Sequence, residues 1–248
     1  VRPSATYLSW LHETVRYARS VRSVLVVGYG SGGLVDALLA IDGVESVTAV
    51  ELSPTLMRSL RAYPEFSGAL RDPRLRLVVD DGRRYLLQSR DRFDLVLMDP
   101  IRSTSSYANN LHSTEFFELV QRHLSPEGVL LLAGVRDRHV LPRTLARAFP
   151  HVRAYGYFLL ASPSPLRSGE EHSPSLLASI PAPQREEVRR SVGEGFRGDR
   201  RFVLEATTGY PVNRELRPWS EYYLGLRMRE AWLSSPDASH SIRPATYR

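Results

Sequence analysis

The stretch that decides the fold lies at residues 24–33, which read VLVVGYGSGG. A short apolar run is typical of a buried strand, and the glycines after it mark a sharp turn, because glycine accepts backbone dihedrals that other residues avoid. From residue 33 to 42, apolar side chains return at helical spacing. A strand, a glycine turn and a helix in direct succession indicate an α/β unit whose backbone N–H groups can approach a ligand closely.

The same alternation of strand and helix continues along the chain. Further strands are expected at 46–50, 75–79, 93–98 and 129–133, with a closing pair at 152–155 and 157–162. Helices are expected at 33–42, 54–63, 83–89, 113–124 and 139–149. Strict alternation predicts an α/β fold with a doubly wound, Rossmann-like, mostly parallel sheet of the class I methyltransferase type, with helices on both faces.

Four parts of the chain differ in composition. Residues 1–22 predict a helical lead-in, and 23–162 form the α/β core. Residues 163–200 are rich in Pro, Ser, Gly, Arg and Glu, with a short helical stretch near 184–192, which predicts a mobile loop, lid or linker near the mouth of the pocket. Residues 201–248 regain apolar content and are expected to pack back on the core.

Composition excludes several classes of protein. No apolar run approaches the roughly 20 residues that cross a bilayer, and no signal peptide is visible, so we expect a soluble, cytoplasmic domain without membrane contact in this stretch. Cysteine is absent, and the seven His are dispersed, so no metal site is expected. All 33 basic residues are Arg, and they are scattered among acids rather than gathered in a stripe, which argues against nucleic-acid binding.

Acidic residues stand where the second and third strands should end. Glu51 lies about 20 residues past the glycines, where an acid accepts hydrogen bonds from ribose hydroxyls. Asp81 can accept one from an adenine amino group. The structural alternatives are a solvated acid at a helix start for Glu51 and a helix cap for Asp81. Because parallel strands end at one edge, we expect a single nucleotide pocket formed by Gly28, Tyr29, Gly30, Ser31, Gly32, Glu51, Leu52, Asp81 and Gly82.

The expected fourth strand ends in Asp99, beside the crevice where such sheets bind ligands. A partly desolvated carboxylate there can act as a general base, and the alternative is a buried acid that caps a neighbouring loop. The loop that follows is placed to cover an acceptor molecule. Its candidate contacts are Arg102, Tyr107, Asn110 and His112, although a lone His is more often structural.

These motifs together resemble the spermidine synthase-like (polyamine aminopropyltransferase) group of class I S-adenosylmethionine-dependent transferases. The matching pieces lie at 24–33, 50–52, 72–74, 81–82, 93–99, 111–117 and 124–129. Residues 211–213, 217–218 and 221–223 resemble the tail of bacterial domains of this group, which are often attached to membrane segments.

The resemblance implies that Glu51 holds the ribose, Asp81 the adenine amino group, and that Asp99 is the catalytic acid or base. Two departures stand out. The group's turn carries an Asp that holds the donor's amino group, where this chain has Ser31. Its active loop carries a second acid that helps bind the polyamine, where this chain has Arg102.

Three functions remain open on this sequence. The leading expectation is methyl transfer from S-adenosylmethionine to a small-molecule acceptor other than putrescine, because Arg102 would repel a polycation if it points into the pocket. The first alternative is aminopropyl transfer from decarboxylated S-adenosylmethionine to an amine. The second is a non-catalytic nucleotide-binding domain, the cytosolic part of a larger membrane protein. A homodimer is compatible with each.

Overall fold

A computed structural model describes residues 5–63, 69–98, 107–169 and 172–222 of the chain. Its eight strands form one sheet in the order β3-β2-β1-β4-β5-β7-β6-β8. The strands are β1 Ser23–Val27, β2 Ser46–Glu51, β3 Leu75–Val79, β4 Phe93–Met98, β5 Leu124–Leu132, β6 His151–Ala154, β7 Leu159–Ser162 and β8 Gly198–Asp199. β1 to β5 pair in parallel, and β7 runs antiparallel to β5 and β6. The predicted fold class is therefore confirmed.

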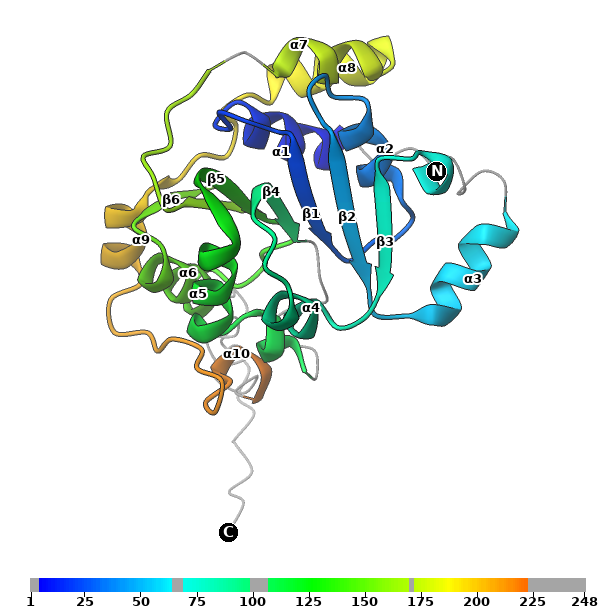
Figure 1. The fold of residues 1–248 in the computed structure, drawn as a ribbon. Helices are drawn as coiled ribbons and strands as arrows, with labels where there is room; N and C mark the ends of the chain where they lie inside the picture. The colour runs from blue at the N-terminus through cyan, green and yellow to red at the C-terminus, as the bar shows by residue number, and fades with distance from the viewer. Residues whose placement is uncertain (1–4, 64–68, 99–106, 170–171, 223–248) are drawn as a thin grey trace, which may run out of the picture.

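Helices cover both faces of this sheet (Figure 1). They are α1 Ala5–Val15, α2 Gly33–Leu39, α3 Pro54–Ala62, α4 Gly82–Gln88, α5 Thr114–His123, α6 Val140–Ala148, α7 Ser173–Ser179, α8 Ala182–Arg190, α9 Arg200–Ala206 and α10 Trp219–Tyr222, with short 3-10 turns η2 Ala69–Arg71 and η3 Ala108–Leu111. Among the described residues, no helix is long and apolar enough to cross a membrane.

The alternation of side chains along β1 builds the two cores. Val24 and Val26 face the core that includes α1 and α2, and Leu25 and Val27 face the core formed with α4, α5, α6 and α9. A strand buried on both faces needs apolar side chains at every position, which is why its sequence reads as a continuous apolar run. Burial of each such side chain stabilises the fold by about 1.5–3 kcal/mol.

β5 begins five residues before the strand expected at 129–133. Leu124 already pairs with Phe93 of β4, and the register shifts before Leu95. Pro126 and Gly128, which are uncommon inside strands, lie at this irregularity. A Cβ at Gly128 would stand 2.9 Å from the carbonyl oxygen of Phe93, so only glycine lets the two strands approach there.

The segment 163–200 differs from its predicted form. It contains α7 and α8, and its apolar side chains Leu176, Ile180 and Val188 are buried in the core with α1. The hydroxyl of Ser175 accepts a hydrogen bond from the N–H of Asp42, in the loop that enters β2. Figure 1 shows α7 and α8 at the end of the molecule opposite the carboxyl ends of β1, β2 and β3.

The position predicted for this segment, at the mouth of the pocket, is therefore wrong. The helical stretch expected near 184–192 corresponds to α8, whereas α7 was not expected, because few apolar residues mark it in a composition dominated by turn formers. Its mobility stays a prediction. Further on, α9 packs against α6 and β6, and the chain continues to α10 beside α6 and η3. Residues 223–248 lie outside the described residues.

Candidate active site

The parallel strands bring the predicted pocket residues to one edge of the sheet. In the order β3-β2-β1-β4, the strand ends that precede Asp81, Glu51 and Gly28 are neighbours. The N–H of Gly28 donates to the carbonyl of Val50 at 2.9 Å, and the N–H of Asp80 donates to the carbonyl of Glu51 at 3.1 Å. These bonds carry the ladder past the strand ends, so the turn and both acidic loops are held together.

The glycine turn has the backbone that only glycine adopts easily. Gly28, Gly30 and Gly32 have φ angles of 93°, 57° and 81°, in the left-handed region. At Gly32 an added Cβ would also stand 2.6 Å from the hydroxyl oxygen of Tyr29. At Gly30 an added Cβ would meet no described residue within 4 Å, so the described part of the chain leaves this side of the turn open. Ser31 is exposed beside it.

Tyr29 contributes backbone to the edge and side chain to the core. Its N–H donates to Glu51 at 3.1 Å, while its ring is buried with α1 and α2. Its hydroxyl makes no hydrogen bond within the described part of the chain. Burial, and then the charge of Asp36, raise the pKa of this phenol to about 12. The phenol therefore stays neutral, and its ring lies close to Gly32 of the glycine turn.

Glu51 ties the first two strand ends together. Its side chain is buried, with one carboxylate oxygen accepting from the N–H of Tyr29 and the other from the N–H of Ser53 at 2.9 Å. The hydroxyl of Ser53 is the cap of α3, accepting from the N–H of Leu56. Glu51 is thus no solvated acid at a helix start. Each carboxylate oxygen keeps a second lone pair that can accept from a ribose hydroxyl, and Leu52 next to it is 70% exposed.

Asp81 is a helix cap, as its structural alternative predicted. One oxygen accepts from the N–H of Arg84 at 2.9 Å, and the other accepts from the side-chain amide of Asn110 at 2.9 Å. Lone pairs remain on both oxygens, so capping and ligand contact are compatible. Gly82 is required by packing, since a Cβ there would stand 2.7 Å from Val27.

The loop after β4 is described from Tyr107 onward. Tyr107 is 84% exposed and has a positive φ of 66°. His112 is buried, and burial lowers its pKa to about 4, although the charge of Asp137 acts in the opposite direction. An imidazole in this place is neutral and enclosed, which supports the structural interpretation of His112 over that of a general base. Asp99 and Arg102 lie outside the described residues.

The buried imidazole predicts a loss of stability in acid. The unfolded chain binds a proton near pH 6.5 and the folded chain only near pH 4, so the unfolded state holds more protons in between. The free energy of unfolding should therefore fall by about 1.4 kcal/mol per pH unit below about pH 6.5, and His112→Asn should remove that share of the slope. Urea unfolding at about pH 5 and about pH 7 measures it, and an unchanged slope in the variant would contradict the assignment.

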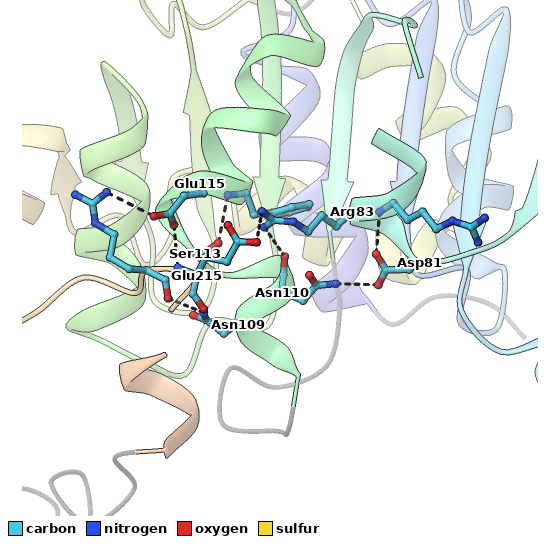
Figure 2. A network of polar contacts seen from close by, with 10 residues as sticks. Asp81, Arg83, Asn109, Asn110, Ser113, Glu115 and Glu215 are labelled. Carbon is cyan, nitrogen blue, oxygen red and sulfur yellow. Dashed lines mark hydrogen bonds and ion pairs between the residues drawn. The ribbon is translucent and has the colours of Figure 1, made fainter. Parts of the chain in front are cut away.

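A polar network joins this edge to the C-terminal segment (Figure 2). Arg83 forms an ion pair with Glu215, and the side-chain amide of Asn109 donates to the carbonyl of Arg214. More than a hundred residues separate these partners in the chain, so spacing gave no signal of the contact. The sequence pointed to this segment only in general terms, through its return of apolar content after residue 200 and its resemblance to the tail of related domains.

Two clefts lined by described residues lie away from this edge of the sheet. One of about 450 Å³ lies between α5, α6 and residues 210–214. Another of about 260 Å³ lies beside α6 and α9, with Arg138 and Arg197 in its lining. Neither includes the glycine turn or Glu51. No group of three or more His, Asp or Glu gathers at a possible metal site in the described ranges.

The strand order and the glycine turn after β1 define a Rossmann-like fold of the class I methyltransferase type. The domain model for the spermine/spermidine synthase domain matches residues 9–142, more than half of the chain. The chain belongs to this family, as the resemblance of its motifs predicted.

The relatives agree with this membership. The chain is 28% identical over 200 residues to a polyamine aminopropyltransferase of Korarchaeum cryptofilum, covering 78% of this chain and 61% of the relative. It is 31% identical over 144 residues to polyamine aminopropyltransferase 2 of Pseudomonas aeruginosa, covering 54% and 41%. The chain thus spans about half the length of the curated relatives it matches.

Two solved structures share the fold. The crystal structure of spermidine synthase from Thermotoga maritima matches with a TM-score of 0.61 and 20% identity, over 82% of this chain and 73% of that one. Human methyltransferase-like protein 13 in complex with SAH matches with a TM-score of 0.52 and 22% identity, over 78% and 92%. Within the family, the named relatives favour aminopropyl transfer over the methyl transfer that was our leading expectation.

Proposed function

We propose that this chain is the nucleotide-binding transferase domain of a polyamine aminopropyltransferase. Its donor is decarboxylated S-adenosylmethionine, and its acceptor is a small amine. The observation that carries the proposal is membership of the spermine/spermidine synthase domain family, in a chain whose buried Glu51 stands against the glycine turn. The homodimer and the cytoplasmic location expected from the sequence stay predictions.

The donor would lie along the carboxyl ends of β1, β2 and β3. Glu51 would accept from the ribose hydroxyls and Asp81 from the adenine amino group, with Leu52 and Gly82 beside the sugar and base. Gly30, open on one side, would let the sulfonium end of the donor approach the backbone. Two carboxylates already fixed by backbone N–H groups need no rearrangement to bind, which lowers the entropic cost of association.

The reaction is a displacement at carbon. The acceptor nitrogen attacks the propyl carbon bound to sulfur, the C–S bond breaks, and methylthioadenosine leaves with the electron pair. The ammonium product loses a proton, for which Asp99, directly after β4 in the chain, is the proposed acceptor. The domain supplies alignment of the nitrogen and carbon together with this base.

Methyl transfer is the second candidate, and Ser31 favours it. The acid that holds the amino group of an aminopropyl donor is absent from the glycine turn, and a neutral, exposed Ser31 stands in its place. A turn without that charge discriminates less between a donor that carries a carboxylate and one that lacks it.

A mass-spectrometric assay separates the two. The purified protein is incubated with decarboxylated S-adenosylmethionine, or with S-adenosylmethionine, and a panel of amines that includes putrescine and spermidine. We expect methylthioadenosine and an amine that has gained one aminopropyl group, with putrescine a poor acceptor if Arg102 replaces a cation-binding acid. A methylated amine and S-adenosylhomocysteine formed with S-adenosylmethionine, with no product from decarboxylated S-adenosylmethionine, would overturn the aminopropyl assignment.

A further inference from the structure

The carboxylate of Asp81 is held at both oxygens by different parts of the chain. The N–H of Arg84, in the first turn of α4, donates to one oxygen, and the side-chain amide of Asn110 donates to the other (Figure 2). The first contact is a common helix cap and fixes only one oxygen. The second comes from η3, 29 residues further along, and fixes the rotation of the carboxylate plane.

Asn110 is in turn held by Arg83. A guanidinium nitrogen of Arg83 donates to the backbone carbonyl of Asn110 at 3.3 Å, and another lies 2.9 Å from a carboxylate oxygen of Glu215. The side chain of Arg83 is only 14% exposed, while that of Glu215 is 55% exposed. A mostly buried guanidinium needs a partner charge, and Glu215 supplies it from the C-terminal segment.

The turn that carries Glu215 is anchored to the core. The N–H of Glu215 donates to the carboxylate of Glu115 at 3.0 Å, and the side-chain amide of Asn109 donates to the carbonyl of Arg214 at 2.8 Å. Just before them, Asn213 is fully buried, and its carbonyl accepts from both the N–H and the hydroxyl of Thr114. Glu215 is therefore presented to Arg83 by a fixed backbone.

We propose that Asn110 and Glu215 are positioning residues, which orient the Asp81 carboxylate for recognition of the adenine amino group. The inference rests on the proposed nucleotide site and goes beyond it, because it makes the C-terminal turn at 213–217 a determinant of base selectivity. The chain of contacts runs from Glu215 to Arg83, to Asn110, and to the oxygen of Asp81 that no backbone group of α4 holds.

The physical basis is geometric. A carboxylate offers about four lone-pair directions, and two are used by Arg84 and Asn110. The remaining pair faces a ligand amino group only if the carboxylate plane is fixed, and without Asn110 rotation about χ2 is broad. Loss of Glu215 acts more weakly, since a half-exposed ion pair contributes little by itself and Arg83 keeps its bond to Asn110.

The test compares two nucleosides that differ at the base. Methylthioadenosine carries the amino group that Asp81 would accept from, and methylthioinosine carries an oxygen there. Isothermal titration gives the ratio of the dissociation constant of methylthioinosine to that of methylthioadenosine, which measures selectivity for the amino group. This ratio should fall about 5- to 10-fold in Asn110→Ala and about 2- to 3-fold in Glu215→Gln. In the Asp81→Ala background, Asn110→Ala should change the ratio no further.

The matched control is Glu205→Gln on α9. Glu205 pairs with Arg201 at 2.8 Å and is 65% exposed, much like Glu215, but the pair lies within α9, away from the nucleotide edge. A general weakening of the fold would reduce affinity for both nucleosides equally and leave the ratio unchanged, which would overturn the positioning role. An effect of Asn110→Ala that persists without Asp81 would overturn it as well. If Asp81→Ala itself leaves the ratio unchanged, the adenine assignment in the proposed function fails instead.

Discussion

The Asp99→Asn variant should lose about 10²- to 10⁴-fold in turnover and keep its affinity for methylthioadenosine. Asp99 directly follows β4, whereas the proposed adenosine contacts lie at the ends of β1, β2 and β3. Asparagine preserves shape and removes the basic oxygen, so the proton released by the attacking amine has no acceptor. The expected loss therefore falls on the chemical step.

Two measurements distinguish this from a general defect. Single-turnover rates with decarboxylated S-adenosylmethionine and an accepted amine measure the rate of the chemical step. Titration with methylthioadenosine measures the affinity of the nucleotide site. Glu205→Gln, on the far helix α9, serves as the control and should keep both values. Full turnover in Asp99→Asn would remove Asp99 from the mechanism, and a parallel loss of nucleotide affinity would assign it to binding.

The Glu51→Ala variant should lose both nucleotide affinity and stability. Its carboxylate accepts from two backbone N–H groups, at Tyr29 and Ser53, in a buried place. Removal leaves both donors unpaired, which costs about 1–3 kcal/mol of stability for each that stays buried and dry. Loss of the bonds to the ribose hydroxyls should weaken methylthioadenosine binding by about 1–3 kcal/mol.

Glu51→Gln separates the two effects, because an amide oxygen can still accept from one of the donors. We expect a smaller loss of stability, measured by urea unfolding, but a loss of affinity close to that of Glu51→Ala. Glu45→Gln is the matched control, since Glu45 forms an exposed ion pair with Arg22 before the amino end of β2. Affinity unchanged in both Glu51 variants would contradict the ribose assignment.

The sequence was most informative where the chemistry of a position is local. A strand buried on both faces is apolar at nearly every position, so β1 and β4 could be predicted from their residues alone, although Ser23 and Asp94 interrupt the apolar pattern. The turn after β1 needs positive φ angles at Gly28, Gly30 and Gly32, and only glycine takes them without strain. The alternation of strands with helices implies parallel strands, whose carboxyl ends share one edge, and this predicts that Glu51 and Asp81 lie at the same edge of the sheet.

Contacts between distant segments could not be predicted. The role of Arg83 depends on Glu215, 132 positions further along, and no periodic pattern records such a pair. A helical stretch near 184–192 could be predicted and corresponds to α8, but α7 could not, because the segment is polar and only a few buried apolar side chains hold it to the core. The burial of His112 likewise follows from what packs over η3, which its own neighbours do not reveal.

A crystal structure of the protein with methylthioadenosine tests the central claim most directly. The account predicts the ribose hydroxyls within hydrogen-bonding distance of the Glu51 carboxylate, the adenine amino group on Asp81, and the sulfur end over Gly30. A nucleotide bound elsewhere, for example in the cleft lined by Arg138 and Arg197, with Glu51 contacting only Tyr29 and Ser53, would contradict it.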